Sequence, residues 1–163
     1  MERQLAGIAR EIVLLFRASP DFSNRIIVRN YHGLLKGKIP DDSLRAACAK
    51  FSADPGAITA EVVSVASDLS KEVHMHKLSH SHCIVLGPRE HMEAPRNAMA
   101  FRHNKWVNLS VGEELDIPPR SVHGFTAHQG GVAHFVLVQS PPAETDDGLS
   151  DDYVRAEKYY DKI

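Results

Sequence analysis

The stretch "VHMHKLSHSHCIVLG", residues 73–87, places four histidines within nine positions, just before an apolar run that ends on glycine. Alternate residues of a β-strand point to the same face, so His74 and His76 are expected to project together. After a short turn, a returning antiparallel strand would direct His80, and by the same alternation His82, towards the same space. Histidine is the commonest metal ligand, so this spacing predicts a site for zinc or another late first-row transition metal.

Two alternatives stay open for these residues. The four histidines could belong to a solvated hairpin, where they would only form hydrogen bonds. Within the metal interpretation, a one-residue bulge would exchange the places of His80 and His82 on their strand. We take His80 as the ligand and His82 as its alternative.

The composition narrows the setting of this motif. At 163 residues, with 43% hydrophobic and 25% charged residues, the chain matches one soluble globular domain with a sizeable core. A formal net charge of −2 argues against a nucleic-acid partner. The two cysteines, Cys48 and Cys83, cannot form a disulfide framework, which favours a reducing cytoplasm. The longest apolar run near the N-terminus, "IVLLF", is too short for a membrane span or a signal segment.

The elements that must position the histidines follow from hydrophobic spacing. Residues 1–57 are predicted to form a helical segment. Its first helix has an apolar stripe at spacings of three and four, and a second helix lies at about 42–53. Residues 58–140 alternate short β-branched runs with turn residues, which is typical of an antiparallel barrel. Residues 141–163 read as an acidic loop and a short C-terminal helix. The residues of the first apolar stripe are Leu5, Ile8, Ile12, Leu15 and Phe16.

The histidine spacing resembles the first motif of the cupin superfamily. That motif has a glycine, an H-x-H pair, a glutamate three or four residues later, and a glycine after six more residues. His74, His76, His80 and Gly87 fit this frame, with histidine where glutamate is usual and without the leading glycine. The loss of a carboxylate removes one negative charge from around the ion, which favours polarising a substrate oxygen or binding an anion.

A second stretch, "GEELDIPPRSVHGF", resembles the second cupin motif. Gly112, Pro118 and His123 stand at motif positions, whereas Arg120 replaces a glycine and Ala127 replaces an asparagine. The two motifs together cover about residues 58–140. The resemblance therefore implies an all-β fold, a cupin (jelly-roll) β-barrel with an N-terminal helical segment, and it makes His123 the fourth ligand.

What the resemblance implies about function is an enzyme that acts on a small polar molecule. One divalent transition metal (Fe, Zn, Ni or Mn) would be held by His74, His76, His80 and His123. The H-x-H-x-x-x-H pattern is also similar to that of thiol dioxygenases with three-histidine iron sites. The reaction is therefore either of the dioxygenase type or of the Lewis-acid isomerase or cyclase type. Cupins often form homodimers, and the apolar first helix is a candidate contact; no membrane partner is expected.

The rival interpretation is a non-catalytic cupin that binds a small ligand. The C-terminal tail of the chain looks like that of mannose-6-phosphate isomerase cupins, which hints at a carbohydrate-related ligand. The residues that carry this likeness are Gln139, Ser140, Asp151, Asp152, Val154, Arg155 and Tyr159.

No catalytic acid or base can be assigned from the sequence. The residues of the pocket wall can be predicted. Residues of one parity on each strand should line the barrel. This parity selects Ile84 after His80, and Phe125 and Ala127 after His123. Arg120 is expected at the barrel mouth, where it would steer an anion. Cys83 has the opposite parity and is predicted to be a packed small residue.

Overall fold

The computed structural model describes residues 1–19, 22, 25, 27–31, 34–66, 73–87, 98–128, 131–142 and 152–156, without the side chains of 27–31, 34 and 35. Two helices and a short 3-10 turn accompany eleven strands in this part of the chain. The helical elements are α1 (Glu2–Ala18), α2 (Asp41–Ala49) and η2 (Pro55–Ala57). The strands are β1 (Ile27–Tyr31), β2 (Leu34–Lys38), β3 (Thr59–Ala66), β4 (His74–His76), β5 (His80–Val85), β6 (Ala98–Arg102), β7 (Lys105–Leu109), β8 (Glu114–Ile117), β9 (Gly124–Ala127), β10 (Val132–Ser140) and β11 (Tyr153–Arg155).

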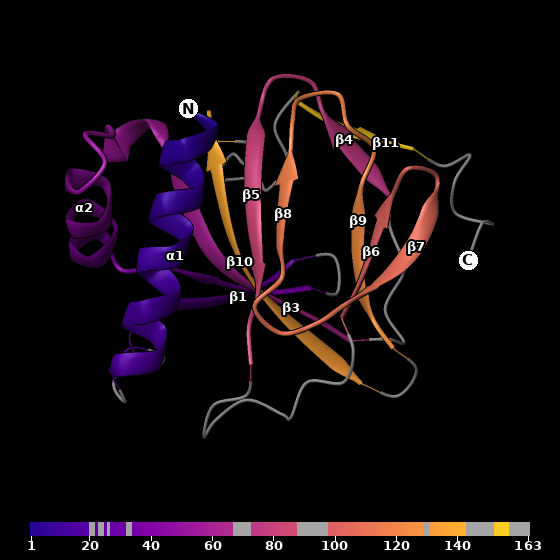
Figure 1. Ribbon diagram of the computed structural model, residues 1–163, viewed down its shortest axis with the longest axis horizontal. Helices are drawn as coiled ribbons and strands as arrows, with labels where there is room; N and C mark the ends of the chain where they lie inside the picture. The colour runs from indigo at the N-terminus through magenta and orange to yellow at the C-terminus, as the bar shows by residue number, and fades with distance from the viewer. Residues whose placement is uncertain are drawn as a thin grey trace.

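The strands form a barrel from two facing sheets. The larger sheet has the order β1-β2-β3-β10-β5-β8, and the smaller one has the order β7-β6-β9. A two-stranded ribbon of β4 and β11 joins the smaller sheet through a bridge between His74 and His123. Figure 1 shows the larger sheet between α1 on one side and β4, β6, β7 and β9 on the other. All named strand pairs are antiparallel, which confirms the predicted mostly-β barrel.

Helix α1 covers the outer face of the larger sheet (Figure 1). It packs against β5 and β10, and its stripe of Leu5, Ile8 and Ile12 is completely buried in one cluster with Ile84 and Val136. Full burial of each such side chain contributes about 1.5–3 kcal/mol. The stripe is therefore used within the chain, which removes it as the predicted dimer contact. No helix in the described part of the chain is long and apolar enough to cross a membrane.

The ends of the chain differ from the sequence prediction. Residues 27–38, placed in a helical segment, form the hairpin of β1 and β2, which extends the larger sheet beside β3. The segment around Tyr153, predicted as helical, is strand β11 and pairs with β4. Tertiary pairing decides both cases, because an available sheet edge satisfies the backbone of a short segment whatever its weak helical pattern. Residues 157–163 of the predicted terminal helix lie outside the described residues.

Strand β5 has apolar residues on both faces. Cys83 and Val85 point into the barrel with Val63 and Phe135, whereas Ile84 belongs to the cluster beneath α1. A strand covered on both faces shows no polar alternation, so its register cannot be read from sequence. The assignment of Ile84 to the barrel interior was therefore wrong by one residue.

Candidate metal centre

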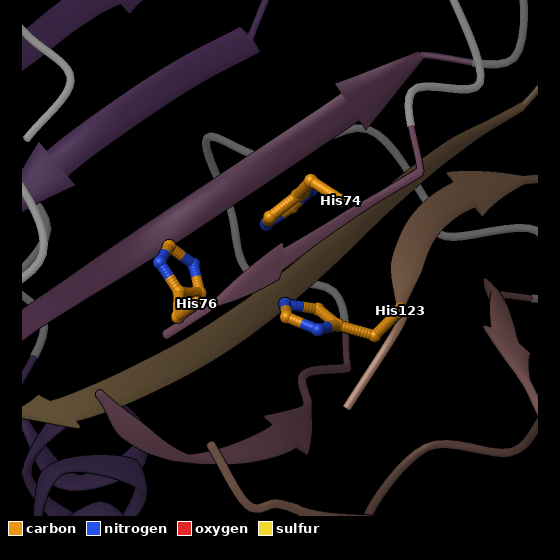
Figure 2. A group of neighbouring side chains, drawn as sticks. All are labelled: His74, His76 and His123. Carbon is orange, nitrogen blue, oxygen red and sulfur yellow. The ribbon is translucent and has the colours of Figure 1, made fainter. Parts of the chain in front are cut away.

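Three of the predicted histidines converge at one end of the barrel interior. The side-chain nitrogens of His74, His76 and His123 that could act as ligands all lie within 4.8 Å of one another. Figure 2 shows the two imidazoles of β4 and that of His123 grouped around a common space. This spacing suits three ligands of one ion, because nitrogens about 2.0–2.1 Å from a zinc ion lie a little over 3 Å apart.

Backbone pairing brings the two motifs together. The amide and carbonyl groups of His74 and His123 exchange two hydrogen bonds of 2.8 Å, so their side chains share a face of the bridge. One step along, the carbonyl of His76 accepts a hydrogen bond of 2.6 Å from the amide of Arg120. The first motif is thus paired directly with the turn and strand start of the second. The ligand geometry is fixed by backbone hydrogen bonds rather than by flexible side chains.

The local electrostatics keep these histidines neutral. Burial, followed by the charges of His123, His76 and Lys36, holds the pKa of His74 well below the usual value of about 6.5. Burial lowers the pKa of His123 to about 4, although its hydrogen bond to Ser121 opposes the shift. The pKa of His76 is also lowered by burial, against the opposite effect of Asp152. Only a neutral imidazole can bind a metal, so near pH 7 all three histidines are in the ligating form.

Two further details fit a metal. The Nδ1 of His123 lies 2.8 Å from the carbonyl oxygen of Ser121, so Nδ1 carries the proton and Nε2 offers its lone pair. The Nδ1 of His74 is buried and has no hydrogen-bond partner among the described residues. An unsatisfied buried nitrogen costs about 1–3 kcal/mol, and coordination would remove that cost. The three residues present therefore fit a divalent transition metal.

Asp152 and Tyr153 belong to the site, although the sequence interpretation placed neither in it. The Oδ2 of Asp152 lies 3.2 Å from the Nδ1 of His76, and both side chains are more than 90% buried. Burial alone would raise the pKa of Asp152, but hydrogen bonds from Ser79 and Leu78 and the charge of His76 lower it overall. The ring of Tyr153 stacks on His74 with centroids 4.5 Å apart. The acidic tail likeness was the only sequence signal for these contacts.

Asp152→Asn is expected to weaken metal binding without unfolding the barrel. A carboxylate beside a ligating imidazole orients the ring and raises its basicity, and losing such a partner typically costs 10–100-fold in affinity. Competition with a fluorescent chelator would measure the change. Asp116→Asn, on the outer face, is the matched control and should leave the affinity unchanged. Equal affinities in both variants and the wild type would show that Asp152 does not support His76.

The predicted fourth ligand does not join the cluster. The Nε2 of His80 contacts Asp116 at 2.7 Å, and the Nε2 of His82 contacts Glu114 at the same distance. The strands β4 and β5 belong to different sheets, because β4 pairs with β11 and β5 pairs with β10 and β8. The hairpin that was expected to return His80 towards His74 is therefore absent from the described strands, and neither His80 nor its alternative His82 belongs to the three-histidine cluster.

Comparison with known proteins identifies the fold. No protein-family model matches the sequence, and neither does any curated protein. The polyketide cyclase RemF from Streptomyces resistomycificus superposes with a TM-score of 0.53 at 18% identity, over 79% of this chain and 84% of that chain. An uncharacterized conserved protein with a double-stranded β-helix domain from Klebsiella pneumoniae superposes with a TM-score of 0.54 at 12% identity. The match covers 85% of this chain and 96% of that chain. A variant of Streptomyces PAC13 with uridine superposes with a TM-score of 0.50 at 13% identity. The match covers 82% of this chain and 85% of that chain. The chain has the cupin fold.

The two glycine positions of the second cupin motif both have a left-handed backbone. Gly112 has a φ of 85°, a left-handed conformation that glycine adopts without strain. Arg120, at the other glycine position, has a φ of 65° and its side chain is exposed. The position therefore requires the left-handed conformation, and a non-glycine residue there is strained by about 1–2 kcal/mol. In this turn the backbone amide of Arg120 donates its hydrogen bond to the carbonyl of His76.

Part of the predicted pocket wall lies on the inner face of the barrel. The ring centroid of Phe125 lies 6.0 Å from that of His123 and 4.8 Å from that of Phe135. Ala127 is buried in the same inner cluster. Phe125 thus gives His123 an apolar neighbour, and apolar surroundings strengthen electrostatic interactions at the centre.

Proposed function

We propose that this cupin is a metal-dependent enzyme that acts on a small polar molecule, with His74, His76 and His123 as the ligands of one divalent ion. The observation that carries the proposal is the convergence of three imidazoles within 4.8 Å, in a setting that keeps them neutral. Three protein ligands are typical of catalytic sites, which keep open positions for substrate, whereas structural zinc sites have four.

The type of reaction follows from the charge of the ligand set. Three neutral imidazoles leave a divalent ion with its full positive charge, and such an ion acts as a Lewis acid towards a substrate oxygen. The chain itself contributes the fixed orientation of His76 through Asp152 and an apolar neighbour of His123 in Phe125. These features support a Lewis-acid reaction of the isomerase or cyclase type.

The structural neighbours support a small-molecule substrate. RemF is a polyketide cyclase and PAC13 binds uridine, so related barrels accept compact organic ligands. We infer the same class of ligand for this cupin.

The proposal is tested by three measurements on protein purified without a histidine tag. Elemental analysis should find about one Fe, Zn, Ni or Mn per chain. Water proton relaxation of the Mn²⁺-loaded protein should show at least one exchangeable position. Screening of small hydroxy and oxo compounds by NMR should detect conversion without oxygen uptake. Stoichiometric oxygen uptake would assign the oxygenase reaction instead, and a bound ion without an exchangeable position would indicate a non-catalytic binding module.

A further inference from the structure

The tail strand β11 (Tyr153–Arg155) pairs with the strand that carries two of the three histidines. Among the described strands its partner is β4 alone, and the register places Tyr153 opposite His76 and Arg155 opposite His74. Figure 1 shows β11 beside β4, on the side of the barrel away from α1. A strand of three residues with one partner makes few backbone hydrogen bonds, and such edge segments open locally at low cost in free energy.

Two neighbouring residues at the start of β11 contact the histidines of β4. The Oδ2 of Asp152 lies 3.2 Å from the Nδ1 of His76, and both side chains are more than 90% buried. The ring of Tyr153 stacks on that of His74, with centroids 4.5 Å apart and planes 22° from parallel. The same ring meets His76 edge-on, with centroids 5.7 Å apart. The tail strand thus contacts two of the three proposed ligands directly.

The three imidazoles are supported in different ways. The imidazole of His123 is held within its own segment, because its Nδ1 lies 2.8 Å from the carbonyl oxygen of Ser121. The two imidazoles of β4 are supported from β11, one by a carboxylate and the other by the face of Tyr153. Because the Nδ1 of His74 has no hydrogen-bond partner in the part of the chain that the structure describes, ring stacking takes the place of a hydrogen bond there. The orientation of two ligands is therefore coupled to the docking of β11.

We propose that β11 is a metal-dependent latch, in which ion binding at the three histidines and docking of the tail strand stabilise each other. The inference rests on the metal centre of the proposed function and adds its regulation, because the docked strand retains the ion and the ion keeps the strand docked. The carboxylate of Asp152 also accepts hydrogen bonds from the amides of Leu78 and Ser79, which return the strand to the same position each time it docks.

Two physical effects couple the ion to the strand. An ion fixes the rotation of both β4 imidazoles, so the docking strand no longer has to order them. A divalent ion also places positive charge beside Asp152 and the ring of Tyr153, and both a carboxylate and an aromatic face are attracted to positive charge. The coupling is reciprocal by linkage. The factor by which the ion favours docking equals the factor by which docking favours ion binding.

Hydrogen exchange followed by NMR, on the full chain after chelation and after loading with Zn²⁺, tests the latch. The amides of Lys77 and Ala156 report on it, since each donates a hydrogen bond of 2.9 Å across the ribbon of β4 and β11. Their exchange should slow by about 5–150-fold on loading, the usual range of coupling between two sites. The amide of Ala57, bonded within a 3-10 turn to the carbonyl of Asp54, is the reference and should keep its rate.

Two pairs of variants test the reverse direction of the coupling. Bonded pairs alternate along an antiparallel ribbon, so Val154 and Met75 form the bonded pair between those of Lys77 and Ala156. Val154→Pro removes that N–H group, and it should undock β11 and weaken Zn²⁺ binding by the factor measured in the exchange experiment. Val154→Ala keeps the N–H group and should retain the affinity. Tyr153→Leu should weaken Zn²⁺ binding by at least about fivefold, and Tyr153→Phe, which keeps the ring, should restore it.

The outcomes separate the latch from the metal centre itself. Unchanged exchange at Lys77 and Ala156 in protein that has bound Zn²⁺ would overturn the latch while the metal centre stands. Wild-type Zn²⁺ affinity in Val154→Pro with rapid exchange of the same amides would overturn it as well. Equal affinities in Tyr153→Leu and Tyr153→Phe would do so even where Val154→Pro fails to fold. A wild-type chain that binds no ion would overturn the proposed function and the latch together.

Discussion

The double variant His76→Ala/His123→Ala is expected to lose its metal while the barrel persists. These two residues come from different cupin motifs and are 6% and 5% exposed, so their removal leaves one ligand and no compensating side chain in the described cluster. Metal affinity should fall by more than the roughly 10–100-fold that follows loss of an outer partner. Elemental analysis after gel filtration, with circular dichroism to verify the fold, measures the effect.

The control for this experiment is His80→Ala/His82→Ala. Both histidines lie on β5 among acidic residues of the outer face, and both were candidates for the same ion on sequence grounds. We expect wild-type metal content in this variant, with a small loss of stability from the contact to Glu114. Loss of the metal here, with retention in His76→Ala/His123→Ala, would reverse the assignment of the centre.

Acid is expected to release the metal and to destabilise the metal-free protein. Protons compete with the ion for each imidazole, and the site has three such ligands without a coordinating carboxylate. In the metal-free protein, the folded pKa of His123 is about 4, whereas the unfolded value is about 6.5. The unfolded chain therefore binds more protons between these values, and stability falls as the pH drops through this window, by up to about 3 kcal/mol.

Urea unfolding of chelated protein between pH 7.5 and 4.5 would measure this dependence. His123→Asn is the matched variant, because it removes the titrating group while keeping a polar side chain of similar size. Its stability should vary less with pH than that of the wild type. A wild-type stability that is constant or rises as the pH falls would contradict the buried, neutral state of the three histidines.

The sequence predicted the barrel, and it singled out the three histidines that the structure brings together, for a physical reason. Short β-branched runs between turn residues indicate antiparallel strands, and the spacing of His74 and His76 is the period of a strand. The position of His123 came from the second motif, and backbone hydrogen bonds join His123 to His74 of β4. Local periodicity was sufficient to predict which nearby side chains share one face of a strand.

The remaining features depend on contacts between distant segments. His80 lies apart from the three histidines because β4 pairs with β11, about 80 residues later, rather than with β5. The inward direction of Cys83 and the outward direction of Ile84 follow from α1, which makes the outer face of β5 apolar as well. Asp152 reaches His76 only because the tail forms a strand. Local patterns carry no information about such partners.

Anomalous diffraction from crystals of the metal-loaded protein tests the central claim most directly. Data collected at the absorption edge of the bound metal locate the ion independently of any substrate. The account predicts one anomalous peak per chain, bounded by the imidazoles of His74, His76 and His123. A peak between His80, His82 and their carboxylate neighbours Asp116 and Glu114, or no peak after loading with Fe, Zn, Ni and Mn in turn, would contradict it.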